Sequence, residues 1–192
     1  MENSVSRSDR ILEKADRTLA RLENISAAIG AWVIFGLMLL SIAEILSRNL
    51  WGAPIRGQFD LIILIGPLYG LLAMSYCYRK AGHVRMDLLN RKLSGRPAWL
   101  AELIITLGAL LITVQLFQGS AMHFERSFQI GDTTLATNWP TWPSKLVVPI
   151  AFALLIARLL VTIWAFGRLV ISPDQRILAV PIPPNPVTER ID

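Results

Sequence analysis

Apolar residues gather in four long stretches that are separated by short polar segments. The first three stretches contain no charged residue, and Arg158 alone interrupts the fourth. The stretches are Ile25–Ala43, Leu61–Tyr78, Leu103–Met122 and Leu146–Gly167. Because a bilayer core about 30 Å thick takes roughly 20 helical residues to cross, each stretch predicts a membrane-spanning helix. We therefore expect an all-α membrane protein with four transmembrane helices, at about 25–47, 60–79, 99–122 and 146–168.

The segment before the first span predicts an amphipathic helix. Leu12, Ala15, Leu19 and Leu22 recur in steps of three and four, with charged residues between them. Two placements are open: this helix lies in the headgroup plane, or it extends the first span into the cytoplasm. We expect the interfacial placement for residues 1–24.

The remaining segments complete the expected organisation. Residues 25–170 form the four-helix transmembrane domain, and residues 171–192 form a Pro-rich cytoplasmic tail, because repeated prolines cannot continue a helix. In the middle loop, Met86, Leu89 and Leu93 share one helical face, which predicts a short amphipathic helix there.

The basic residues are sorted between the two sides of the membrane. Most lie before the first span, between the second and third spans, or after the fourth. The other two loops hold Arg48, Arg56, Arg126 and Lys145. The positive-inside rule therefore places both termini and the middle loop in the cytoplasm.

Composition agrees with a membrane protein and narrows its chemistry. The chain is 53% hydrophobic and carries a formal charge of +5, and its short loops leave no room for a separate soluble domain. Anionic lipid accounts for the charge better than nucleic acid does. Cys77 is the sole cysteine and no Cys/His cluster is present, so we expect no disulfide, metal site or cofactor, with Cys77 as a small core residue.

Arg158 is the most informative charge, because an arginine at the centre of a span costs about 2.5–3.5 kcal/mol on insertion. It should therefore face protein or reach an interface. Glu102 is the acidic residue closest to Arg158 in expected depth in the membrane, and a contact with another subunit is the alternative.

Near the outer ends of the first two spans, Glu44 and Asp60 could pair with Arg48 or Arg56.

Two further features concern packing and surface. Gly66 and Gly70 have the small-xxx-small spacing that lets a neighbouring backbone approach, and we expect packing within the bundle.

The outer loop, Glu125 to Lys145, is polar and approaches the membrane through Trp139 and Trp142. It suits the docking of a soluble partner, or its tryptophans mark the membrane interface. The candidate docking residues are Arg48, Arg126, Asp132, Trp139 and Trp142.

The segment after the second span carries a family resemblance. Gly82-His83-Val84-Arg85-Met86-Asp87-Leu88-Leu89 resembles the Gly-His-Val/Ile-x-Val-Asp-Leu-Leu signature of the small, DctQ-type membrane subunits of TRAP (tripartite ATP-independent periplasmic) transporters. Ser47 to Pro54, Asp60-Leu61 and Trp139 to Pro143 resemble other family segments in the same order. This chain departs from the family pattern with Asp60 for Glu and Met86 for a β-branched residue.

The resemblance implies an accessory transport subunit in a bacterial inner membrane, and no enzyme. Its partners would be a large membrane subunit, which it supports, and a periplasmic substrate-binding protein, which it could help to dock. The system would take up organic acids with a sodium gradient. Gly82, His83 and Asp87 would then be structural, since His83 and Asp87 are one helical turn apart and could hydrogen-bond or cap the second span.

Two other classes of protein remain as alternatives. A membrane-anchor subunit that holds a b-type haem needs two histidines on one haem, whereas His83 and His123 lie on opposite sides of the predicted bundle. A self-sufficient four-span exporter needs an acidic residue near the middle of a helix, whereas Glu44 and Glu102 lie near span ends.

Overall fold

The structure, a computed structural model, describes residues 7–80 and 96–171. They form the helices α1 (Arg7–Trp51), α2 (Gln58–Leu72), α3 (Met74–Arg79), α5 (Arg96–Ile130) and α6 (Trp142–Ile171). Four helical segments are long and apolar enough to cross a membrane, with α2 and α3 together making the second. The predicted four-helix membrane fold is confirmed. The expected middle-loop helix and the Pro-rich tail lie outside the described residues.

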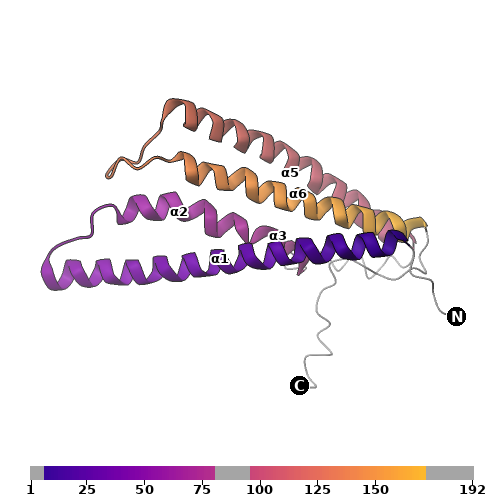
Figure 1. The fold of residues 1–192 in the computed structure, drawn as a ribbon, viewed down its shortest axis with the longest axis horizontal. Helices are drawn as coiled ribbons and strands as arrows, with labels where there is room; N and C mark the ends of the chain where they lie inside the picture. The colour runs from indigo at the N-terminus through magenta and orange to yellow at the C-terminus, as the bar shows by residue number, and fades with distance from the viewer. Residues whose placement is uncertain (1–6, 81–95, 172–192) are drawn as a thin grey trace, which may run out of the picture.

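The helices form an elongated bundle with α6 in a central position (Figure 1). Helix α5 packs along α6, while α1 packs against α2, α3 and α6. We call the end with the start of α1 and the end of α6 the N-terminal end. The loop end holds the α1–α2 and α5–α6 connections. Helices α1 and α6 continue past the end of α3 towards the N-terminal end (Figure 1).

Helices α5 and α6 each carry a set of residues that repeats every seven positions. On α6, buried positions alternate in steps of four and three at Ala151, Leu155, Arg158, Thr162, Ala165 and Leu169. On α5, small hydroxyl residues recur every seventh position at Thr106, Thr113, Ser120 and Ser127. The hydroxyl groups of Thr106 and Thr113 donate hydrogen bonds to the backbone carbonyls of Glu102 and Ala109 in the same helix. Such small residues let two helix backbones approach closely in a membrane.

Helix α1 is continuous from the amphipathic segment into the first span. The expected amphipathic segment and the first span form one helix, Arg7–Trp51, and not two separate ones (Figure 1). Leu12 and Leu19 are buried, whereas Leu22 stays exposed. The continuity fits the alternative in which the segment extends the first span, while its position relative to the bilayer stays a prediction.

The second span is interrupted at Ala73 and not at its proline. Pro67 lies within α2, and α3 begins after Ala73. An added Cβ on Gly66 or Gly70 would meet no atom within 4 Å, so the expected packing at these glycines within the bundle is wrong. The close approach occurs instead at Gly30, whose added Cβ would lie 3.6 Å from the carbonyl oxygen of Tyr69.

The prediction that Cys77 is a core residue is also wrong, because its side chain is exposed.

Candidate functional site

A cluster of buried charges joins three helices near the N-terminal end. Glu23 of α1 is 0% exposed and Arg158 of α6 is 2% exposed. Arg158 places Nη1 2.5 Å from Asp16 Oδ1 and Nε 3.8 Å from Glu23 Oε1. The central arginine of α6 is thus paired with two acidic residues of α1.

Helix α3 adds a second arginine to the same carboxylate. Arg79 Nε lies 2.6 Å from Glu23 Oε2, and Ser75 Oγ donates a 2.7 Å hydrogen bond to Glu23 Oε1. The Arg79 guanidinium also donates to Asn24 and lies 5.3 Å from the ring centroid of Tyr76. Glu23 therefore fixes α1, α3 and α6 relative to one another.

The cluster is balanced in charge. Two arginines, Arg158 and Arg79, face two carboxylates, Asp16 and Glu23, so no net charge is buried. Glu23 Oε2, Arg79 Nε and Arg158 Nε lie at ion-pair distances but not in hydrogen-bond geometry. The cluster thus combines ion pairs with directed hydrogen bonds from Ser75 to Glu23 and from Arg158 to Asp16. Removing one member would leave a buried charge uncompensated, which costs about 3–5 kcal/mol in proteins.

The partner of Arg158 corrects the sequence prediction. Glu102 lies on α5 and is not among the acids that contact Arg158. The sequence did contain the signal for the true partners, since Asp9, Asp16 and Glu23 recur every seven residues on one face of α1. Asp9 extends the pattern by pairing with Arg168 of α6. An intrachain pair, one of the expected possibilities for Arg158, is what the structure shows.

At the loop end, Asp60 organises the α5–α6 connection. Its carboxylate is 6% exposed. Its Oδ2 accepts hydrogen bonds from Ala136 N at 3.1 Å, Thr137 N at 2.8 Å and Thr137 Oγ1 at 2.7 Å. The expected pairing of Asp60 with Arg48 or Arg56 is therefore wrong, because neutral donors from a distant loop surround it. The expected pair of Glu44 with Arg48 is confirmed, with Nε and Oε1 3.0 Å apart.

The connection itself is a tight turn. Thr134 N donates to Trp139 O at 2.9 Å, and Asn138 takes a left-handed conformation with φ 55°. Gly57 in the α1–α2 loop also has a left-handed φ of 84°, and an added Cβ there would overlap the methyl group of Thr137. Both loops therefore depend on a close approach that only glycine permits at position 57.

Lys145 closes the base of the turn on Asp132. Their Nζ and Oδ2 atoms are 2.9 Å apart. This hydrogen bond, followed by the positive charge of the same lysine, holds the pKa of Asp132 below its ordinary value. Asp132, a candidate docking residue, thus already has a partner within the chain.

The other candidate docking residues gather at the loop end but differ in exposure. Arg126 is exposed, and Trp139 and Trp142 keep 42% and 37% of their surface accessible. Trp142 packs edge-on against Phe128, with ring centroids 5.8 Å apart. Leu135, which the sequence did not single out, is the most exposed of the large apolar residues described and lies beside the two amides held by Asp60. No sequence signal distinguishes it from other leucines.

The motif residues Gly82, His83 and Asp87 lie outside the described residues, so their structural role stays a prediction. Within residues 7–80 and 96–171, no three His, Cys, Asp or Glu side chains gather in a way that could hold a metal ion.

Comparison with known proteins gives one match. The family model described as the DctQ component of tripartite ATP-independent periplasmic transporters matches residues 37–168, more than half of the chain. No curated protein and no solved structure matches the chain.

Proposed function

Because this chain belongs to the DctQ family of TRAP transporter components, we propose that it supports the large membrane subunit of a sodium-coupled uptake system for organic acids. Family membership and the four spans make it the small, multi-pass membrane subunit of such a transporter. The bacterial inner membrane is its location, with the N-terminal end of the bundle in the cytoplasm.

The Glu23-centred cluster is the observation that carries the supporting role. It ties α1, α3 and α6 together at one end, while Asp60 ties α2 to the α5–α6 loop at the other. A bundle fixed at both ends suits a part that holds still while a neighbouring domain moves. The mobile, substrate-carrying elements would then belong to the large subunit.

Reconstitution tests this role. Proteoliposomes with the large subunit and binding protein are prepared with and without this chain, and sodium-driven uptake of the organic acid is measured. We expect strong loss of uptake without the chain, and no uptake by the chain alone. Undiminished uptake without it would contradict the proposal.

We further propose that the loop end helps to dock the periplasmic binding protein. Three exposed features support this role: the apolar side chain of Leu135, the charge of Arg126 and the half-exposed ring of Trp139. Asp60 holds the backbone amides of the two residues after Leu135, so less backbone freedom is lost when a partner binds there.

The docking role has a test with an internal control. Arg126→Glu and Leu135→Ser should raise the binding-protein concentration needed for half-maximal uptake, without reducing the amount of assembled membrane complex. Lys80→Glu, an exposed charge reversal at the end of α3 and away from this loop, serves as the matched control. Unchanged half-saturation in both variants would assign the loop to membrane anchoring alone.

A further inference from the structure

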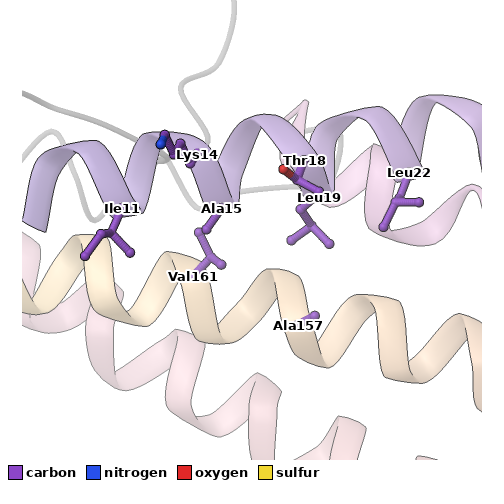
Figure 2. Close-up of a pocket in the computed structure, with 8 residues that line it drawn as sticks. All are labelled: Ile11, Lys14, Ala15, Thr18, Leu19, Leu22, Ala157 and Val161. Carbon is purple, nitrogen blue, oxygen red and sulfur yellow. The ribbon is translucent and has the colours of Figure 1, made fainter.

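An apolar groove runs between α1 and α6 at the N-terminal end (Figure 2). It has a volume of about 500 Å³ and is lined almost entirely by apolar surface. The lining includes Ile11, Ala15, Thr18 and Leu22 from α1 with Ala157 and Val161 from α6. These α1 residues cover about 16 Å of helix at 1.5 Å per residue, so the groove is long and narrow.

Four exposed basic residues near the start of α1 form a stripe beside this groove. Arg10, Lys14, Arg17 and Arg21 are all exposed and recur in steps of four, three and four, which places them on one face of the helix. Lys14 also belongs to the lining of the groove. A row of positively charged side chains therefore runs alongside the apolar groove.

This arrangement arises because α1 sorts its charges around its axis. Asp9, Asp16 and Glu23 turn inward to the arginines of α3 and α6. Glu13 is left as the exposed acid of the segment, and it pairs with Arg17. The outer face is thus strongly basic although acids and bases are equally frequent between Asp9 and Asn24.

The groove is also continuous with surface suited to the bilayer. Leu22 leads to Ile25, which is 58% exposed at the start of the first apolar stretch. On α6, Trp164 lies on the same face as Ala157 and Val161, by helical spacing, and is 41% exposed. Tryptophan is enriched where membrane and water meet.

We propose that this groove binds an anionic phospholipid. One acyl chain lies along the apolar channel between α1 and α6, and the phosphate contacts Lys14 and the neighbouring basic residues. Clusters of four or more basic residues on an amphipathic helix favour anionic lipid, and an apolar channel beside them holds the lipid in one orientation. The site is independent of the proposed transport role, since it requires only this chain and a membrane.

The headgroup is tested with a matched pair of charge variants. The purified chain in mild detergent is mixed with equal amounts of phosphatidylglycerol and phosphatidylcholine of the same acyl chains, and retained lipid is counted by native mass spectrometry. We expect preferential retention of phosphatidylglycerol. Lys14→Gln should lower that retention about fivefold, the factor for about 1 kcal/mol per basic residue near a membrane surface. Arg56→Gln, an exposed change at the loop end, should leave it unchanged.

The acyl chain is tested by filling the groove. Thr18 is exposed, so Thr18→Trp should occupy the channel without disturbing the core, and retention of both lipids should fall. Ala43→Trp, at an exposed position of the same helix beyond the groove, is the control.

Several outcomes would overturn the proposal. These are equal retention of the two lipids by the unmodified chain, an equal loss in Lys14→Gln and Arg56→Gln, or unchanged retention in Thr18→Trp. Retention by the isolated chain but not by its complex with the large subunit would assign the groove to the protein partner instead.

Discussion

The two ends of the bundle hold a buried carboxylate in opposite ways. At the N-terminal end, Glu23 is surrounded by the guanidinium groups of Arg79 and Arg158. At the loop end, Asp60 is surrounded by two backbone amides and a hydroxyl group. The first arrangement connects three helices through mutual charges, so each member depends on the others. The second connects one helix to one loop, and its donors stay neutral if the acid is lost.

Arg158→Leu should produce the largest effect, because it breaks the charge balance of the cluster. Asp16 would lose its arginine and Glu23 would keep only Arg79, so we expect a loss of about 3–5 kcal/mol in the free energy of unfolding. Thermal unfolding in detergent measures this loss. The span itself should still insert, because leucine is favoured over arginine at a span centre.

A compensating variant sharpens the same comparison. Arg158→Leu combined with Asp16→Asn and Glu23→Gln removes the unpaired charges and should recover much of the lost stability. If Arg158→Leu alone has the same thermal unfolding as the unmodified protein, the ion pairs of Arg158 do not contribute to the stability of the fold.

Gly57→Ala should have the next largest effect, at the loop end. An alanine there must adopt the left-handed conformation, which costs about 1–2 kcal/mol, and it must also displace the methyl group of Thr137. Adding Thr137→Ser removes that methyl group but keeps the hydroxyl that binds Asp60, so part of the stability should return. No recovery would mean that backbone strain alone accounts for the loss.

Asp60→Asn tests the neutral environment directly. The amide keeps an acceptor oxygen but loses its charge, and hydrogen bonds to a neutral acceptor are weaker. We expect hydrogen exchange at the Ala136 and Thr137 amides to become roughly fivefold faster, with little change at the N-terminal end. Equal acceleration along α1 would show that the two ends are energetically coupled.

The smallest effect is expected at Asp132, which is partly exposed. The pairing with Lys145 lowers its pKa in the folded protein, so the pair stabilises the turn above the ordinary pKa of aspartate. This contribution is lost as the pH falls through the lowered pKa. Hydrogen exchange of the turn followed between neutral and acidic pH should show the loss, and Lys145→Met should reduce the pH dependence, leaving the smaller part that Ser127 and Arg126 contribute. Added salt should weaken the pair as well, because exposed charges are screened.

The spans could be predicted from sequence, because an apolar stretch of about 20 residues has few other uses. The family could be predicted from the motif between Gly82 and Leu89 and the segments that accompany it. The lengths of the helices could not, since α1 and α5 continue for several turns beyond their apolar stretches. The extension of α1 is stabilised by ion pairs of Asp9 and Asp16 with α6, and the sequence does not show which helix supplies the partners.

The partners of the two buried acids show where sequence reasoning stopped. The seven-residue spacing of Asp9, Asp16 and Glu23 is visible in the sequence, where it also fits the polar face of an amphipathic helix. In the continuous α1, the same spacing places these acids against α6. Asp60 is close in sequence to Arg48 and Arg56, whereas its donors lie in a loop more than seventy residues away. Only the tertiary fold brings them together.

The continuity of α1 has a mechanical consequence. Positions seven residues apart share one direction around its axis, so Glu23 meets Arg158 and Gly30 meets Tyr69 only while the helix keeps a single rotational phase. One inserted residue between them would turn one half by about 100° against the other, so the two halves could not both engage their neighbours. The rotation of one half of α1 about its axis is therefore coupled to that of the other half. Insertions and deletions should be tolerated in the loops but not within this helix.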